Sequence, residues 1–523
     1  MRRTQSIRQL TLADAEKRWN LRSGGVAEHG NLEGKGEAVV EKAENLLGHV
    51  LHRGNLYGAF EQVAGNKGAH GIDGLSIEDV SANLLENVEI LRDSVRNGTY
   101  RPLPVRRVRI PKRGGGTRNL GIPTVQDRWL QQAVAQVIGP QVEAVLSDHS
   151  FGFRPGRNAH QALERAARYY DEGYRWVVDI DLQSYFDTLN HDLLLNMVRE
   201  VIADESVTRL IHQFLKAGVM DGKALIATKE GSPQGGNLSP LLSNLYLTRF
   251  DRELERRGLR FVRYADDINI YTKSKRAARR VMRSSTRYLE KRLKLTVNQA
   301  KSKVGDPTEL KFLGFTLGHP EADRKRWAKQ KKHKRRKPKR AGKVGLGARS
   351  KAPTRTTSSA KKVARPKGGG SKPIRVTPQG EKTTIRIHPK SQEHFKNEVR
   401  RRTGRHQGRK RTEILKDLGE YTNGWLGYYA RADMRKWVEG VDGWIRRRVR
   451  AIMLTQWKTP ACVYKNLRKL GANPKWAKIV AGNSRGMWRN AGKPANKCLQ
   501  NEHLVQMGYE SLLTRYEILH NNW

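Results

Sequence analysis

Cysteine is nearly absent from this chain of 523 residues, which contains only two. Cys462 and Cys498 stand far apart, and neither belongs to a CxxC pair. This excludes a disulfide framework and a zinc module, and it is typical of a reducing compartment. No apolar run approaches the roughly 20 residues that a membrane-spanning helix needs. The basic N-terminus has no apolar core segment, so we expect neither a secretory signal nor a membrane partner.

Acidic residues are scarce relative to basic ones. The chain has 101 Lys and Arg against 51 Asp and Glu, and its formal net charge is +50. A basic excess of this size is typical of a protein that binds a polyanion, most often nucleic acid. The alternative is a basic surface that is merely solvated.

Composition divides the chain into four parts. Residues 1–44 lack a sustained apolar period and predict a mobile tail, whereas residues 45–318 carry regular apolar patterns. Residues 319–383 form a basic linker, in which positions 324–380 hold 22 Lys or Arg and no Asp or Glu. Such a segment cannot bury enough apolar surface to offset its ordering entropy, so we expect it to be disordered. Residues 384–523 hold 7 of the 11 tryptophans and are expected to be mostly helical.

Local patterns predict several elements in the second part. Apolar residues at helical spacing predict helices over 125–146 and 277–293, and a Val-rich run predicts a strand over 174–181. Gly139-Pro140 should bend or interrupt the first helix, because proline lacks a backbone N–H.

The sharpest local signal runs from Arg260 to Tyr271. Two apolar runs flank Asp266 and Asp267, which is the pattern of a tight β-hairpin with two carboxylates at its tip. Adjacent aspartates at a turn are more often only turn residues, because Asp favours such positions. A second acidic strand end therefore decides the interpretation.

That second strand end contains Asp179 and Asp181, which period two places on one strand face. Two strands that end in acids side by side can hold two divalent cations. Such a pair, roughly 3.5–4 Å apart, activates an attacking hydroxyl and stabilises a leaving pyrophosphate. Hard oxygen ligands favour magnesium. The pattern therefore indicates nucleotidyl transfer.

Together these segments resemble the group II intron reverse transcriptase/maturases, of the bacterial kind that lacks an endonuclease domain. Tyr264-Ala-Asp-Asp267 is similar to the family's YADD box, and Asp181 followed by Phe186 is similar to the strand that supplies the third acid. The resemblance implies an α+β right-hand polymerase fold, with fingers and palm over 45–318 and a helical thumb/maturase domain over 384–523.

The resemblance also implies residue roles. Asp181, Asp266 and Asp267 would be the catalytic acids and would bind two Mg²⁺ ions, for which Mn²⁺ could substitute. Phe186 would be the steric gate that excludes a 2′-hydroxyl. The nucleotide-binding residues would be Lys112, Arg118, Phe186, Gln234 and Lys301. Leu313 and Gly314 would form the primer grip.

Further expectations concern nucleic-acid contacts and the core. The residues implied to bind nucleic acid are Arg154, Arg446, Arg447, Arg448 and Arg450. The aromatic residues expected mostly in the core are Tyr421, Trp425, Tyr428 and Trp444. Asp187 is expected to cap a helix over 188–201.

The implied substrates are deoxynucleoside triphosphates. The implied macromolecular partners are structured intron RNA, an RNA template with its DNA primer, and target DNA, with no obligatory protein partner evident. The implied location is the bacterial cytoplasm, in association with the nucleoid. No Cys-paired nuclease module follows the thumb, and the linker is longer than the family's usual joint between palm and thumb.

Two alternatives stay open at this stage. One is a domesticated cellular reverse transcriptase of the same lineage that acts in DNA repair or phage defence. The other is an RNA-binding splicing factor without polymerase activity, which the three intact acids disfavour. An RNA-dependent RNA polymerase is disfavoured because Phe186 should exclude ribonucleotides.

Overall fold

The computed structural model describes residues 45–111, 116–233, 235–320, 323–324, 382–404, 408–484 and 486–521. The tail expected at 1–44 and nearly all of the linker expected at 319–383 lie outside the described residues. Lys112 and Gln234, two of the predicted site residues, also lie outside them. Across the described ranges, no helix is both long and apolar enough to cross a membrane.

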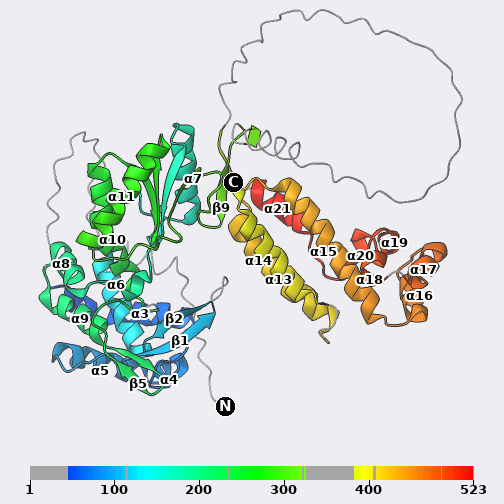
Figure 1. The fold of residues 1–523 in the computed structure, drawn as a ribbon. Helices are drawn as coiled ribbons and strands as arrows, with labels where there is room; N and C mark the ends of the chain where they lie inside the picture. Colours follow the sequence, from blue (N-terminus) through cyan, green and yellow to red (C-terminus); the bar gives the residue numbers. More distant parts are fainter. Residues whose placement is uncertain are drawn as a thin grey trace, which may run out of the picture. The chain divides into compact units, whose positions relative to one another are not determined.

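The N-terminal region combines helices with a small sheet (Figure 1). Its elements are α2 (Leu46–Val50), α3 (Arg53–Gly65), α4 (Ile77–Ala82), α5 (Leu84–Arg96), β1 (Val105–Pro111), β2 (Thr117–Ile122), α6 (Val125–Val145), β4 (Val219–Asp221) and β5 (Ala224–Ile226). The sheet order is β2-β1-β4-β5, with β1 parallel to β4 and the other pairs antiparallel. The buried indole of Trp129 on α6 donates to the carbonyl of Leu56 over 2.7 Å, which fixes α3 on α6.

Helix α6 runs unbroken through Pro140, so an interruption at Gly139-Pro140 is wrong, and a bend there stays a prediction. Pro140 is exposed, and water can therefore satisfy the carbonyl that its missing N–H leaves without a helical partner. The first half of the helix, by contrast, is buried and holds its direction by packing.

The central region contains a second four-stranded sheet, which is antiparallel throughout and has the order β6-β7-β3-β8. Its strands are β3 (Trp176–Ile180), β6 (Arg260–Tyr264), β7 (Asp267–Thr272) and β8 (Lys303–Gly305), and its helical elements are α7 (Ala159–Asp171), η1 (Tyr185–Asp187), α8 (His191–Val201), α9 (Glu205–Lys216), α10 (Ser239–Arg256) and α11 (Lys275–Arg292). Helix α7 covers one face of the sheet, and α10 and α11 lie on the other (Figure 1). The strand predicted at 174–181, the hairpin at 260–271 and the helix at 277–293 are confirmed.

The helix expected at 188–201 begins later, at His191. Its N-cap is Asn190, whose side chain accepts from the backbone N–H of Leu193 over 2.9 Å. The predicted capping role of Asp187 is wrong, because a separate 3-10 turn holds that residue before the helix begins.

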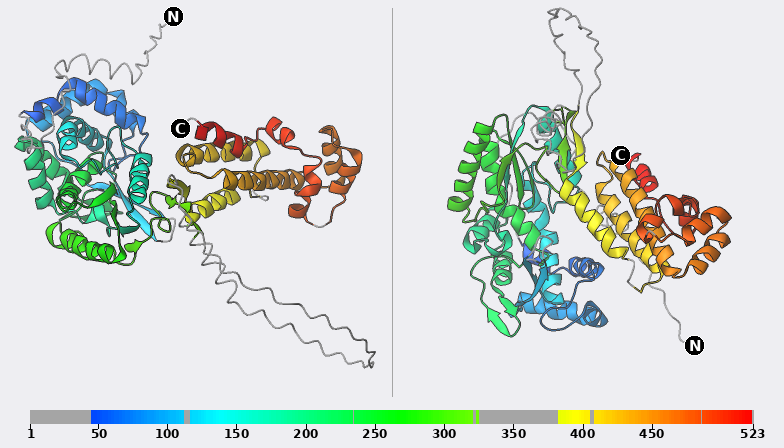
Figure 2. Two further views of the ribbon diagram at one scale, coloured as in Figure 1. Left: turned by 90° about the horizontal axis from the view of Figure 1, so that it is seen from above. Right: turned by 45° about the vertical axis from the view of Figure 1, so that its right-hand side comes forward.

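The C-terminal region is helical, as expected (Figures 1 and 2). Its helices are α13 (Pro389–Arg402), α14 (Arg411–Tyr429), α15 (Arg435–Gln456), α16 (Pro460–Lys469), α17 (Pro474–Ala481), α18 (Met487–Asn490), α19 (Lys493–Asn496), α20 (Asn501–Gln506) and α21 (Leu512–Asn521). Helix α13 packs on α14, and α21 packs on both α14 and α15. Trp425 is buried, and Tyr421, Tyr428 and Trp444 are partly buried against the same core, in line with their expected roles.

A two-stranded ladder joins the sequences that flank the linker. β9 (Phe315–Gly318) pairs antiparallel with β10 (Thr384–Ile387), so that Gly318 lies opposite Thr384. The hydroxyl and backbone N–H of Thr383 also donate to the carboxylate of Asp171 at the end of α7. The linker is therefore an insertion at the end of a β-hairpin, and its length does not set where α13 begins.

Candidate active site

The β-sheet register brings the three predicted acids to one edge of the central sheet. Strands β3 and β7 pair Ile180 with Ile268, and the next pair along that register is Asp181 and Asp267. Asp266 precedes Asp267 at the tip of the β6–β7 hairpin. The carboxylate of Asp181 is close enough to raise the pKa of Asp266 and the pKa of Asp267.

A buried charge network holds the hairpin tip. The guanidinium of Arg263 on β6 is fully buried and forms an ion pair of 2.6 Å with the equally buried carboxylate of Asp251 on α10. It also donates to the side-chain oxygen of Asn244 over 2.8 Å and to the carbonyl of Ala265 over 3.1 Å. Because Ala265 has a positive φ of 55°, the bond to its carbonyl supports a backbone shape that alanine rarely adopts.

A glycine lets a neighbouring loop approach this tip. A Cβ on Gly152 would lie 2.4 Å from the backbone nitrogen of Ala265, so only glycine fits. The carbonyl of Gly152 accepts from the amide of Asn244 over 2.8 Å, which ties the loop to the same network. The tip that carries Asp266 and Asp267 is therefore fixed from two sides.

The acids share an unfavourable electrostatic environment. Burial, then the carboxylates of Asp266 and Asp181, raise the pKa of Asp267 to about 6. Burial, then the carboxylates of Asp267 and Asp181, raise the pKa of Asp179 to about 7. Burial also raises the pKa of Asp266, and the guanidiniums of Arg118 and Arg263 oppose that shift. Clustered carboxylates of this kind are stabilised when a cation binds among them.

The donor set suits a hard divalent cation, because carboxylate oxygens are the ligands that such ions prefer. Across the described ranges, no three His, Cys, Asp or Glu side chains form a preformed metal cluster. The chemistry of the donors and the raised pKa values of Asp266 and Asp267 fit bound cations, whereas a closed ligand cage is not built in advance.

Asp181 is held by the segment that returns after α11. Its backbone N–H donates to the hydroxyl of Ser302 over 3.1 Å, and its carbonyl accepts from Asn298 over 2.9 Å. The ammonium of Lys301 lies 3.4 Å from its carboxylate. Lys301, predicted from the sequence as nucleotide-binding, is thus at the site.

The turn that carries Phe186 contacts a loop of residues 231–233 and 235–236, which flank Gln234 in the sequence. The carbonyl of Phe186 accepts from the N–H of Ser232 over 2.6 Å, and the N–H of Gly231 donates to the carbonyl of Leu189 over 2.7 Å. Gly231 has a φ of 93°, and a Cβ there would lie 2.8 Å from the carbonyl oxygen of Asp187. The backbone of this loop therefore packs directly against the turn that carries Phe186.

The same loop reaches the first sheet. A Cβ on Gly235 would lie 2.4 Å from the carbonyl oxygen of Gly121 on β2, the strand that also carries Arg118. Arg118 is exposed and lies near enough to Asp266 to affect its pKa. The loop thus connects the strand of Arg118, the turn of Phe186 and the acidic edge.

The predicted primer-grip residues form a strained turn before β9. Leu313 and Gly314 have positive φ values of 50° and 89°. The hydroxyl of Tyr428 donates to the carbonyl of Leu313 over 2.9 Å, and the hydroxyl of Ser391 donates to that of Gly314 over 2.8 Å. A Cβ on Gly314 would meet the hydroxyl of Tyr429 at 2.4 Å. Helices α13 and α14 therefore hold this turn.

Two of the five predicted nucleic-acid contacts are wrong. Arg154 is buried, and its guanidinium is occupied by the carboxylate of Glu143 and by the carbonyls of Ser147 and Ser150. Arg450 is also buried and donates to the carbonyl of Leu499 over 2.7 Å. Burial lowers the pKa of Arg450 to about 10. Both side chains stabilise the chain's own backbone and have no face for a phosphate.

The other three predicted arginines are partly exposed. Arg446 forms an ion pair with the buried carboxylate of Asp442, and Arg448 donates to the carbonyl of Thr403 over 3.0 Å. Arg447 instead donates to the carbonyl of Trp488 over 3.0 and 2.8 Å. A nucleic-acid contact stays a prediction for all three.

The residues that hold the hairpin tip were not predicted from the sequence. Arg263 interrupts the apolar run from Phe261 to Ala265, and a charge inside a strand between apolar neighbours is a usable signal. Its partners Asp251 and Asn244 lie on one face of α10, where nothing local distinguishes them from surface residues.

Comparison with known proteins adds family membership to this geometry. Residues 110–317 match the reverse transcriptase (RNA-dependent DNA polymerase) family, and residues 392–471 match the group II intron, maturase-specific domain. The protein YkfC of Escherichia coli strain K12 is 37% identical over 293 residues, which is 48% of this chain and 77% of YkfC. The chain belongs to the group II intron reverse transcriptase/maturase family.

Other relatives are matched over a smaller share. The group II intron-encoded protein LtrA of Lactococcus lactis is 36% identical over 43% of this chain, and the match spans only 38% of LtrA. A solved partial Cas6-RT-Cas1–Cas2 complex covers 51% of this chain and 46% of its own, at 24% identity and a TM-score of 0.32. In the terms of the group II intron family, the chain has an α+β reverse transcriptase domain followed by a helical maturase-specific domain. Such domains bind RNA and depend on divalent metal.

Proposed function

We propose that this chain is an RNA-directed DNA polymerase whose catalytic acids are Asp181, Asp266 and Asp267. The observation that supports this most is their convergence at the β3–β7 edge, opposite the exposed cation of Arg118. We propose that the acids bind two Mg²⁺ ions, for which Mn²⁺ could substitute. When bound, the ions would activate the primer hydroxyl and stabilise the leaving pyrophosphate.

The chain's own residues would position the nucleotide. Arg118 and Lys112 would clamp the triphosphate, and Gln234 would contact the incoming nucleotide; Lys112 and Gln234 lie outside the described residues. The ammonium of Lys301 lies 3.4 Å from the carboxylate of Asp181. Once cations bind to that carboxylate, the ammonium would leave it and contact the phosphates of the substrate. Leu313 and Gly314 would hold the primer end, since α13 and α14 fix their turn.

Domain boundaries belong to the same proposal. Residues 45–318 would form the fingers and palm with an N-terminal extension, and residues 384–523 would form the thumb and maturase domain. The β9–β10 ladder supports a joint between the two, since it crosses the proposed boundary. The tail at 1–44 and the linker at 319–383 would be additional segments.

A second role is proposed for the whole protein, which would bind its intron RNA, assist splicing and support intron mobility into target DNA. The maturase-specific match and the net charge of +50 support it. We propose a bacterial cytoplasmic location beside the nucleoid, where both partners would be found.

Primer extension tests the catalytic assignment. Asp266→Asn and Asp181→Asn should each abolish extension of a DNA primer on an RNA template, because a neutral amide is a poor ligand for the ions. Template affinity should persist. Glu290→Gln, which removes an exposed carboxylate on α11, is the matched control and should extend normally. Near-normal extension by either Asp variant would contradict the assignment.

Splicing tests the second role separately. A protein carrying Asp266→Ala and Asp267→Ala should still promote splicing of an intron RNA found around its gene, because folding the RNA needs no polymerase metals. Circular dichroism checks that the variant is folded. Loss of splicing in a folded variant would count against two separable roles, and the absence of a ribozyme around the gene would favour a domesticated enzyme.

A further inference from the structure

The C-terminal helices contain a long basic stretch. Between Gly443 and Asn501 the sequence has 14 Lys or Arg and no Asp or Glu. The maturase-specific match ends at residue 471, so helices α17 to α21 lie beyond it. Arg446 of this stretch is paired with Asp442 and Arg450 is buried, but the exposed cations that remain attract polyanions.

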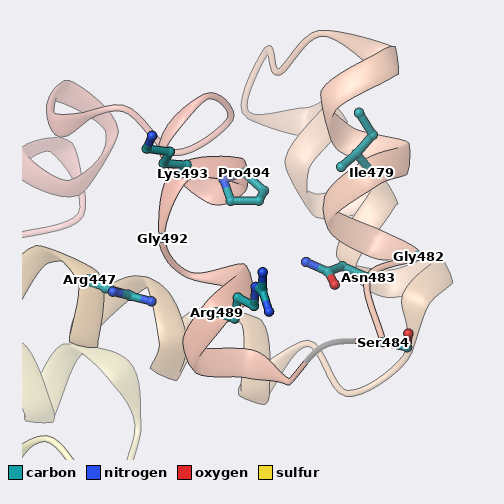
Figure 3. Close-up of a pocket in the computed structure, with 9 residues that line it drawn as sticks. All are labelled: Arg447, Ile479, Gly482, Asn483, Ser484, Arg489, Gly492, Lys493 and Pro494. Atoms are coloured by element: carbon teal, nitrogen blue, oxygen red, sulfur yellow. The ribbon is translucent and has the colours of Figure 1, made fainter. Parts of the chain in front are cut away.

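A pocket of about 620 Å³ opens within this stretch. Arg447 of α15, Asn483 after α17, Arg489 of α18 and Lys493 of α19 line it, and no acidic residue does. Figure 3 shows Arg447 and Lys493 on one side, Ile479 on the other, and Arg489 and Asn483 between them. The volume lies in the range of small-ligand sites, roughly 300–1,000 Å³.

Arg447 is held in place at the wall of this pocket. It donates twice to the carbonyl of Trp488, and its guanidinium stacks on the Trp488 ring at 4.4 Å from the centroid. A Cβ on Gly492 would come within 3.3 Å of that guanidinium, so the absence of a side chain at Gly492 leaves space for Arg447. A cation fixed this way loses little entropy when an anion binds.

The other two cations have no internal partner. Arg489 and Lys493 are exposed, and neither side chain makes an ion pair or hydrogen bond within the part of the chain that the structure describes. Ile479 exposes 42% of its surface at the pocket, and Trp488 exposes 37% beside it. Phosphate-binding charges thus adjoin apolar and aromatic surface, the combination that binds single-stranded nucleic acid.

We propose that this pocket binds an unpaired nucleotide of single-stranded RNA. Its phosphates contact Arg489 and Lys493, and its base lies on the exposed apolar surface of Ile479, which lines the pocket. A paired base would be turned into its duplex and could not reach that surface. The proposal deepens the RNA-binding part of the proposed function and rests on it for the source of the RNA.

Photocrosslinking of the full-length protein tests the pocket. The probe is a short single-stranded oligouridylate with one thiouridine, and crosslinked peptides are identified by mass spectrometry. We expect a crosslink in the peptide that contains Trp488 or Ile479. Arg489→Gln with Lys493→Gln should reduce it about tenfold, because two phosphate contacts are lost. Lys475→Gln with Lys478→Gln removes the same charge from exposed positions of α17 outside the pocket, and should leave it unchanged.

Every outcome decides the proposal. No crosslink at either peptide, or equal crosslinking in the Arg489/Lys493 variant, would overturn it. Equal crosslinking when the probe is annealed to its complement would show a backbone-binding surface and overturn the nucleotide pocket. Stronger competition by the deoxyribose form of the probe would overturn the assignment to RNA. None of these readouts uses polymerase activity, so primer extension that survives Asp266→Asn would refute the polymerase site alone.

Discussion

Phe186 owes its position to a single turn of 3-10 helix. The residue is half-buried, its ring lies 5.4 Å from that of Tyr185, and its carbonyl is tied to Ser232. Phe186→Ala should raise the incorporation of ribonucleotides relative to deoxyribonucleotides by about tenfold or more, because the ring that would meet a 2′-hydroxyl is gone. Single-nucleotide incorporation measures the ratio. Phe186→Tyr keeps the ring and should keep the selectivity; an unchanged ratio in Phe186→Ala would remove the gate assignment.

Asp179 is a second residue with a testable role, because its titration should make the free energy of unfolding depend on pH. Its pKa is raised from 3.8 to about 7, first by burial and then by neighbouring carboxylates. A raised folded-state pKa means that the folded chain holds the proton more tightly. The free energy of unfolding is therefore unaffected below the unfolded pKa and falls as pH rises toward the folded one.

Thermal unfolding without divalent metal measures this effect. Between about pH 5 and about pH 8 the native protein should lose more stability than Asp179→Asn, by about 1 kcal/mol or more, since one pKa unit is worth about 1.4 kcal/mol. The variant keeps every other charged residue of this chain, whose net charge is +50, and it therefore controls for general effects of pH. Parallel losses in the two proteins would show that Asp179 is not the titrating group.

At the scale of elements, the β6–β7 hairpin depends on the buried pair of Arg263 and Asp251. Arg263→Met should destabilise the fold by roughly 3–5 kcal/mol, because it leaves the Asp251 carboxylate buried and unpaired. Primer extension should fall as well, because the carbonyl of Ala265 loses its donor. Arg260→Met, at the exposed start of the same strand, is the control.

A double variant separates stability from positioning. Arg263→Met with Asp251→Leu removes both charges and should recover much of the stability. Extension should stay low at a temperature where the protein is folded, because the bonds to Asn244 and Ala265 remain absent. If extension returned together with stability, Arg263 would be a structural residue with no part in holding the catalytic tip.

At the scale of the whole molecule, the linker and the C-terminal helical region are separable features. Strands β9 and β10 close the ends of the linker, so a change inside it need not move α13. Replacing 324–380 by a neutral Gly-Ser segment of equal length removes 22 positive charges and keeps the number of residues in the linker. Binding to any RNA or DNA should weaken, whereas extension at saturating template should change little.

Salt dependence measures the linker's contribution. Each phosphate contact adds about −0.9 to the log–log slope of affinity against salt on duplex DNA and about −0.7 on single strands. The native chain should therefore show the steeper slope. Equal slopes in the two proteins would leave the linker as a solvated spacer, and a lost extension rate would show that its charge acts on the thumb.

The sequence by itself determined the local elements and the identity of the acids. Alternation around Asp266-Asp267 predicted the hairpin, and a Val-rich run predicted β3, because the apolar period alone selects a strand. Antiparallel pairing then brings the ends of those strands together. The catalytic roles stay predictions, and the register places the three acids at one edge of the central sheet.

Only the tertiary structure decided which charged residues are buried. Arg154 and Arg450 were predicted from the sequence to contact nucleic acid, yet both are buried and bonded to other groups of the chain. Arg489 and Lys493 read no differently and stay exposed at a pocket. Burial of a charge depends on whether distant segments supply its partners, and those contacts exist only once the chain has folded.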